Sequence, residues 1–130
     1  MTKDLIDKNP VLKHSIEFSL LTIKYCELLS EQKKFVISKQ LLRSSTSIGA
    51  NIIESQNSES KADFIHKLKI ASKEADETQY WLILCDFSTD YPDCRNLFNK
   101  LTEIQKLLNS ILKTVKTKSP ISYLMSFLIF

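Results

Sequence analysis

Residues 41–54 read LLRSSTSIGANIIE, a stretch in which two helical patterns run side by side. One pattern is apolar and joins Leu41, Ile48 and Ile52, so this side is expected to face a core. The other is polar, has spacings of four, four and three residues, and consists of Arg43, Ser47, Asn51 and Glu54. Residues at these spacings share one side of a helix, which must be solvated, mutually hydrogen-bonded or in contact with a partner.

Gly49, the only glycine of the chain, lies in the middle of this stretch. A glycine inside a helix costs roughly 1 kcal/mol relative to alanine. We therefore expect a neighbouring helix to approach the backbone closely at this position.

The composition favours long helices within one domain. The chain has 130 residues, of which 43% are hydrophobic and 25% charged, with one glycine and three prolines. Three cysteines, Cys26, Cys85 and Cys94, have no C-x-x-C spacing, so we expect reduced thiols and a cytoplasmic location. The N-terminus has no apolar core resembling a signal peptide, and no apolar run is long enough for a membrane span, so a soluble protein is expected.

Apolar periodicity predicts four helices. The first opens at Asn9 and Pro10 and runs to about Leu29, with an apolar stripe of Leu12, Ile16, Leu20 and Ile23. Beside this stripe lie Phe18, Leu21, Tyr25 and Leu28, and so broad a face predicts burial on more than one side. The second covers about residues 34–56, and its seam consists of Ile37, Leu41, Ser45, Ile48 and Ile52. The third follows a capping box of Ser60 and Asp63, and its seam consists of Phe64, Leu68, Ala71, Ala75, Thr78, Leu82 and Cys85. The fourth has Pro92 at an early position, and its seam consists of Leu97, Leu101, Ile104, Leu108, Ile111 and Val115.

Short links between long helices favour antiparallel neighbours. The sequence thus predicts an all-α fold, an up-down-up-down antiparallel four-helix bundle formed by residues 1–118. Residues 119–130 form an apolar tail in which eight of the last ten residues are apolar. That tail is too short to span a membrane, and it could fold back on its own bundle, contact another subunit or anchor to a membrane surface.

Catalytic and cofactor motifs are missing from the sequence. His14 and His66 fall on different predicted helices, and no Glu-x-x-His pair exists, so no metal is expected. A single glycine cannot build a phosphate-binding loop, a dinucleotide fingerprint or a nucleophile elbow. We expect no cofactor and no enzyme activity.

Charge divides sharply along the second half of the chain. Residues 74–93 carry six acids and no base, whereas residues 94–118 carry six bases and one acid. The net charge of +3 is mild, but such a face could contact phosphates of RNA or DNA. The candidate nucleic-acid-binding residues are Lys34, Lys39, Arg95, Lys100, Lys106, Lys113 and Lys116. The alternative is a solvated face that meets the acidic helix of a neighbouring subunit.

The polar stripe has two interpretations as well. It could form a buried structural network of Arg43, Ser47, Asn51 and Glu54, with Glu77 as the charge partner of Arg43. It could instead face a partner. Tyr80 and Trp81 follow the seam of the third helix and could be core residues or anchors of a subunit interface.

A family resemblance rests on two segments. Residues 40–54, QLLRSSTSIGANIIE, resemble the hallmark of small bacterial proteins encoded in intervening sequences of 23S ribosomal RNA genes. Residues 60–64, SKADF, together with Ile70, Ala71, Glu77 and Gln79, match the continuation. The resemblance covers about residues 10–116 and departs at Ser55, where the family usually has glycine. The same family includes accessory proteins of diversity-generating retroelements.

This resemblance implies a four-helix bundle that assembles into a homo-oligomeric ring, typically a pentamer, without enzyme activity. For the retroelement members it also implies binding of nucleic acid and of a reverse transcriptase. The leading hypothesis is therefore a non-enzymatic homo-oligomer that binds RNA or DNA by phosphate contacts. A structural or protein-interaction oligomer without nucleic-acid binding is the alternative.

Overall fold

The computed structural model describes residues 3–116, which contain five α-helices and no strand. The helices are α1 (Lys3–Asp7), α2 (Pro10–Glu31), α3 (Phe35–Ser55), α4 (Lys61–Phe87) and α5 (Arg95–Lys116). The all-α prediction is confirmed, with one helix more than predicted, the single-turn α1. The predicted tail at residues 119–130 lies outside the described residues.

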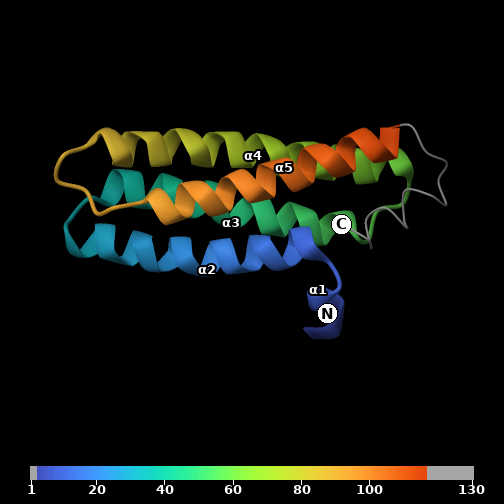
Figure 1. Cartoon of the computed structure of the whole chain (residues 1–130), viewed down its shortest axis with the longest axis horizontal. Coiled ribbons are helices and arrows are strands. Elements are labelled where there is room, and N and C mark those ends of the chain that lie inside the picture. Colours follow the sequence, from blue (N-terminus) through green and yellow to red (C-terminus); the bar gives the residue numbers. More distant parts are fainter. Residues whose placement is uncertain (1–2, 117–130) are drawn as a thin grey trace.

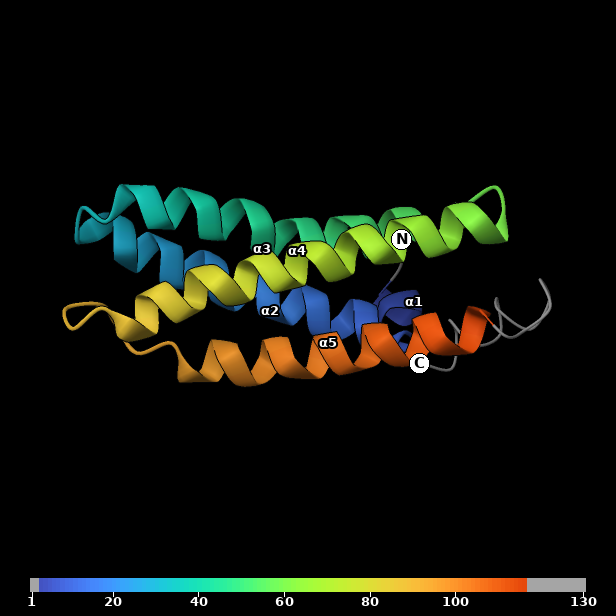
Figure 2. The same cartoon turned by 90° about the horizontal axis from the view of Figure 1, so that it is seen from above.

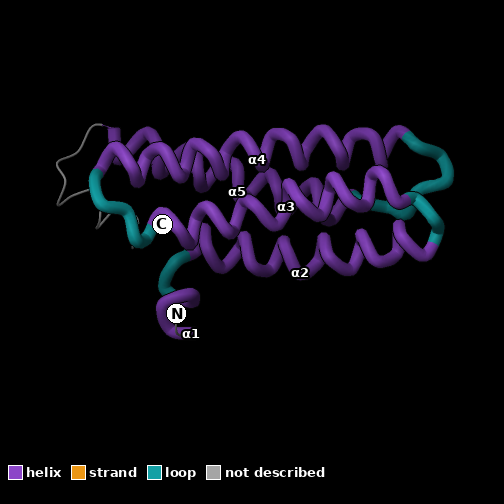
Figure 3. The backbone as a smooth tube through the Cα atoms, turned by 180° about the vertical axis from the view of Figure 1, so that it is seen from behind, coloured by secondary structure: helices purple, strands orange, loops and turns teal. Residues whose placement is uncertain are grey.

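Four long helices lie side by side, and α1 lies at one end against α2 (Figure 1). The closest pairs are α2 with α3, α3 with α4, α4 with α5, and α5 with α2, so α3 and α5 face each other diagonally (Figure 2). The α2–α3 and α4–α5 connections lie at one end of the molecule, and the α3–α4 connection lies at the other (Figure 3). None of the helices in the described residues is long and apolar enough to cross a bilayer.

Side-chain caps begin two helices where the sequence predicted them. The Asn9 side chain accepts a hydrogen bond from the Leu12 backbone N–H at 3.3 Å, and Pro10 follows as the first helical residue. Ser60 accepts from the Asp63 N–H at 3.1 Å, while the Asp63 carboxylate accepts from the Glu59 N–H at 3.3 Å. The carboxylate thus binds one residue earlier than in the usual capping box.

The turn from α2 to α3 is a Schellman motif built around Lys33. This residue has a φ of 62°, a left-handed conformation usually taken by glycine. The Lys34 N–H donates to the Leu29 carbonyl and the Lys33 N–H to the Ser30 carbonyl, both at 2.9 Å. These bonds satisfy carbonyls at the end of α2 and reverse the chain within three residues.

Pro92 is not inside a helix, contrary to the sequence prediction. It lies in the loop before α5, which begins at Arg95. Its carbonyl accepts a hydrogen bond of 2.7 Å from the Tyr25 hydroxyl of α2, which fixes the loop against α2. A proline can start a helix, but it is equally suited to a loop, and sequence alone does not distinguish the two.

The predicted seams of α4 and α5 are confirmed in full, because every one of their residues is buried. The seam of α3 is confirmed except for Ile37, which is only half-buried. These seams meet α2 in one continuous core.

The predicted apolar face of α2 is confirmed only in part. Of the stripe Leu12, Ile16, Leu20 and Ile23 only Leu12 is buried, and Leu20 is 58% exposed. Phe18 and Tyr25, which were predicted to lie beside the stripe, are buried. The helix is rotated so that its buried side consists of Val11, Leu12, Ser15, Phe18, Thr22, Tyr25, Cys26 and Leu29. The hydroxyls of Ser15 and Thr22 donate to carbonyls of their own helix at 2.7 and 2.8 Å, so these polar residues can be buried in the core.

Gly49 faces α2, as expected, but the approach is not tight. A Cβ atom added there would meet the Ser15 Cβ at 3.5 Å and the Ser19 hydroxyl oxygen at 3.9 Å. Both distances are ordinary van der Waals contacts, and Gly49 has a negative φ.

We therefore predict that Gly49→Ala stabilises the protein by up to about 1 kcal/mol, the difference in helix propensity between the two residues. Urea unfolding followed by circular dichroism measures this change. Gly49→Leu is the matched control, and its larger side chain should destabilise the protein by overlapping α2. A loss of stability in Gly49→Ala would mean that the helices are closer than the described packing.

Candidate nucleic-acid interface

Three of the candidate basic residues share the outward side of α5. Arg95, Lys106 and Lys113 are separated by eleven and seven residues, close to three and two helical turns. They lie opposite the buried seam of α5 and are exposed. We call these three residues the α5 basic face.

The surroundings of this face are set by contacts on both flanks of α5. On the α4 side, the Gln105 amide donates to Asp76 at 3.3 Å and to Gln79 at 3.2 Å. On the α2 side, His14 Nδ1 lies 3.7 Å from a Glu103 carboxylate oxygen. Lys106 borders a shallow groove of about 340 Å³ beside this pair.

The charged groups of the α5 basic face differ in whether they form ion pairs. The Arg95 guanidinium pairs with Asp93 at 3.2 Å, and this contact holds the pKa of the Asp93 carboxyl below its usual range. Lys106 and Lys113 have no ion-pair partner among residues 3–116. Their ammonium groups are therefore the ones on this face that are available to an anionic ligand.

The other predicted basic residues do not extend the α5 basic face. Lys100 and Lys116 lie on its flanks by helical position. Lys39 is exposed on α3, which is diagonal to α5. In the single chain, Lys39 therefore lies apart from the α5 basic face, and the role of these residues in binding stays a prediction.

Lys34 connects the α2–α3 turn to the α4–α5 loop at one end of the molecule. Its ammonium group lies 3.1 Å from Asp90 and 4.7 Å from the centre of the Tyr91 ring. Its side chain is only 16% exposed. A cation held by both a carboxylate and an aromatic ring is a structural clamp between the α2–α3 turn and the α4–α5 loop.

The polar stripe of α3 lies at the α3–α4 surface. Arg43 pairs with Glu74 at 3.1 Å and with Glu77, the partner predicted from the sequence. The Trp81 indole N–H donates to Glu77 at 3.0 Å, and this bond together with Arg43 lowers the pKa of the Glu77 carboxyl. The prediction of a buried network is wrong, because the Arg43 side chain is 50% exposed.

The remaining stripe residues bond to their own helix. Ser47 donates to the Arg43 carbonyl and Asn51 to the Ser47 carbonyl, both at 2.8 Å, while Glu54 is exposed. The buried polar contact between α3 and α4 is one that the sequence analysis missed. It joins the hydroxyls of Ser44 and Thr78 at 2.9 Å. A serine in an apolar seam facing a threonine was the signal that could have indicated it.

The thiols are unsuited to nucleophilic chemistry. Cys26, Cys85 and Cys94 are all buried. Burial raises the pKa of the Cys26 and Cys94 thiols to about 11, so both are protonated at neutral pH. Among residues 3–116 no group of three His, Cys, Asp or Glu side chains could hold a metal ion.

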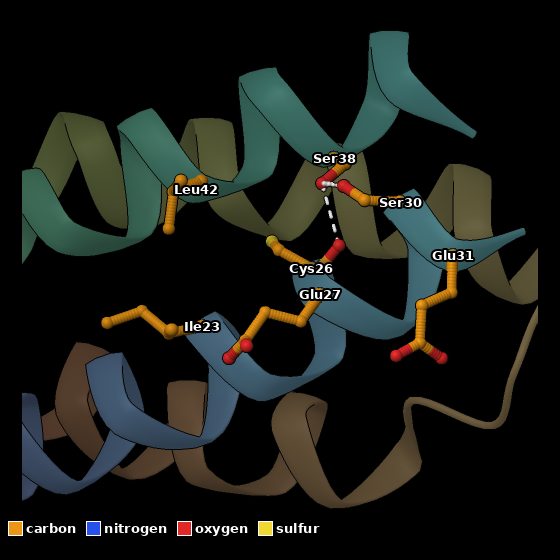
Figure 4. A pocket seen from close by; sticks show the side chains of 7 residues that line it. All are labelled: Ile23, Cys26, Glu27, Ser30, Glu31, Ser38 and Leu42. Carbon is orange, nitrogen blue, oxygen red and sulfur yellow. Dashed lines mark hydrogen bonds between the residues drawn. The ribbon is translucent and has the colours of Figure 1, made fainter. Parts of the chain in front are cut away.

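Apolar side chains remain exposed on two other surfaces. On α4, Phe87 is 81% and Tyr80 53% exposed, and the Tyr80 ring meets Trp81 edge to face. On α2 and α3, an open groove of about 490 Å³ is bordered by Ile23 and Leu42 (Figure 4). Its floor contains the Ser38 hydroxyl, which bonds the Cys26 carbonyl at 2.9 Å.

Comparisons with known proteins agree on one family. A family model described as 23S rRNA-intervening sequence protein matches residues 7–110. A crystal structure of a protein with unknown function from the S23 ribosomal protein family of Bacteroides thetaiotaomicron is 50% identical. The match covers 80% of this chain and 99% of that chain, with a TM-score of 0.75. No curated protein matches the chain. The resemblance to retroelement accessory proteins stays a prediction.

The half-exposed position of Arg43 gives a prediction about stability. Arg43→Gln should lower the free energy of unfolding by no more than about 1 kcal/mol, because solvent screens exposed ion pairs. Thr78→Val is the buried comparison, and it should cost about 1 to 3 kcal/mol, because the buried Ser44 hydroxyl then keeps only its long bond of 3.5 Å to the Leu41 carbonyl. Urea unfolding of both variants tests this order. A larger loss for Arg43→Gln would assign the structural role to the exposed network.

Proposed function

We propose that this chain, which belongs to the family of 23S rRNA-intervening sequence proteins, is a non-enzymatic homo-oligomer that binds RNA or DNA. The observation that carries the proposal is the α5 basic face, in which Lys106 and Lys113 are exposed without ion-pair partners among residues 3–116. Ammonium groups in this state can neutralise phosphates and release counterions.

The mode of binding follows from the spacing of the charges. Lys106 and Lys113 are seven residues apart, which corresponds to about 10 Å along a helix. Each would contact a different phosphate. Such contacts position a nucleic acid without reading its bases, so we propose binding without sequence preference.

The scaffold that we propose for this function is an up-down-up-down antiparallel four-helix bundle of α2, α3, α4 and α5. The pairing of each long helix with two others, and the alternation of connections between the two ends, support this topology. Such a bundle holds α5 along its full length, so the basic side chains project from a rigid surface.

Assembly of several copies would increase the number of α5 basic faces that one particle presents. One chain carries a net charge of only +3, and several copies in a ring would present several α5 basic faces together. The exposed aromatics Tyr80 and Phe87 support a subunit contact on α4, since aromatic residues are typical anchors of interfaces. A ring of five, which the family resemblance implies, requires this patch to meet a different patch of the next copy.

The second candidate function is a structural or protein-interaction oligomer. It is favoured by the exposed acids of α4, Asp76 and Asp86, which could pair with α5 of a neighbouring copy. A protein partner, such as a reverse transcriptase, would then meet the surface of the assembly. In that case the α5 basic face would be covered by protein and would not be open to phosphates.

The double variant Lys106→Glu with Lys113→Glu tests the nucleic-acid proposal. We expect it to weaken binding of mixed single-stranded RNA at least tenfold at about 0.1 M salt, because two phosphate contacts are lost. The slope of log affinity against log salt should become smaller in magnitude by roughly 1.4 to 2. Fluorescence anisotropy at several salt concentrations gives both quantities.

The matched control for this test is Lys69→Glu with Lys73→Glu. It changes the net charge equally but alters exposed lysines of α4. It should reduce binding much less than the α5 variant. Equal losses in the two variants would contradict a specific α5 site, and loss of the oligomer in the α5 variant would favour the second candidate.

The proposed subunit contact is tested by Tyr80→Ser with Phe87→Ser. Light scattering of the unaltered chain should give a mass near five times 15.0 kDa, and this variant should approach a single copy of 15.0 kDa. Phe35→Ser, which removes another exposed aromatic from the start of α3, should leave the mass unchanged. A monomeric unaltered chain would remove the oligomer proposal.

A further inference from the structure

An apolar surface runs along the outer side of α2 and α3. Ile16, Leu20 and Ile23 share one side of α2 because they are four and three residues apart. Leu42 and Ile53 share one side of α3, and both are exposed. Ile23 and Leu42 border the same open groove, so the two sides meet there (Figure 4). We call these five residues the α2–α3 face.

This face is unusual for a surface in contact with water. It contains the apolar residues that periodicity assigned to the core of the first long helix, displaced outward because Ser15 and Thr22 are buried in their place. Exposed apolar side chains that gather on one side of a molecule normally mark a site that another segment covers. No segment within residues 3–116 covers Leu20, which is 58% exposed.

The sequence supplies a matching segment. Residues 121–130 read ISYLMSFLIF and contain no charged side chain. They begin five residues after the end of α5 at Lys116, and they lie beyond residue 110, where the family match ends. The segment is therefore not part of the family match.

Position and length allow the segment to reach the face. The end of α5 lies at the same end of the molecule as the start of α2 (Figure 1). The 14 residues from 117 to 130 can span at most about 46 Å when extended, whereas the 22 residues of α2 are about 33 Å long. The segment can thus pass Leu20 and reach the groove at Leu42.

The charges at the groove favour this occupant over a lipid surface. Glu27 and Glu31 line the groove, and their carboxylates would repel an anionic membrane. An uncharged apolar peptide meets no such repulsion. We propose that residues 121–130 dock on the α2–α3 face of the same chain and cover Leu20 and Leu42.

Disulfide trapping in the full chain tests this proposal. Ser126→Cys places a thiol in the segment at little cost in shape, and Leu42→Cys places one at the groove. Under mild oxidation at high dilution, this pair should form an intramolecular disulfide at least tenfold faster than the control pair. The product has monomer mobility on a non-reducing gel, and mass spectrometry identifies the linked peptides.

The control pair is Ser126→Cys with Lys106→Cys. Lys106 is ten residues from Lys116, or about 15 Å along α5, so it is nearer to the origin of the segment than Leu42 is. If the segment did not dock, the control pair would therefore form its disulfide at least as fast as the pair with Leu42→Cys. Ser126→Cys alone reports any reaction with the native thiols, which are all buried.

Two results would overturn the proposal. One is a disulfide between Ser126→Cys and Leu42→Cys that forms no faster than the disulfide of the control pair. A disulfide-linked dimer from the same pair would also overturn it, because it would assign the face to a second copy. The other result needs no substitution. It is flotation of the unaltered chain with phosphatidylglycerol vesicles at about 1 M salt, where electrostatic contacts of the α5 basic face are screened. Absence of the chain from the vesicle fraction supports docking, whereas co-flotation would place the segment in lipid.

Discussion

The burial of the α5 seam is the constraint on which the other features depend. Six aliphatic residues from Leu97 to Val115 recur at spacings of three and four, and all are nearly or fully inaccessible. Burying such a side chain contributes about 1.5 to 3 kcal/mol, so any rotation of α5 about its axis would be costly. The same seam therefore determines that Lys106 and Lys113 project into water. Hydrogen bonds from Gln105 to α4 stabilise this rotation from one flank. The basic face is in this sense a consequence of the core.

Small hydroxyl residues determine the rotation of α2 and its distance from α3. Ser15 and Thr22 of α2, with Ser44, Ser45 and Ser55 of α3, occupy positions where aliphatic side chains would be expected. Their hydroxyls bond to nearby carbonyls, so burial leaves no unpaired donor. Because these side chains are short, α2 and α3 lie next to each other at Gly49 with ordinary van der Waals spacing. The larger apolar side chains of α2 then remain on the outside, which creates the α2–α3 face.

The surfaces of the molecule thus have different chemistry on different sides. α5 presents ammonium groups, α4 presents exposed aromatics, and α2 with α3 presents an aliphatic groove bordered by carboxylates. At one end of the molecule, the Lys34 clamp joins the two loops, and the hydrogen bond from Tyr25 to Pro92 fixes the α4–α5 loop against α2. A molecule with several unlike surfaces is suited to contacts between different patches, whereas a single self-complementary patch would favour a dimer.

The sequence by itself determined the helical class, the caps at Asn9 and Ser60, and the seams of the last two helices, because local hydrogen bonding and aliphatic periodicity act within one element. It also indicated the pair of Arg43 with Glu77 and the outward charges of α5. The tertiary structure alone decided that Lys34 is clamped, that Arg43 is half-exposed and that Pro92 lies in a loop. It also decided which side of α2 is buried. These outcomes depend on contacts between segments that are distant in the sequence. Lys34 is withdrawn from water only because Asp90 and Tyr91 replace the water around its ammonium group. The buried side of α2 depends on which of its sides packs against α3 and α5.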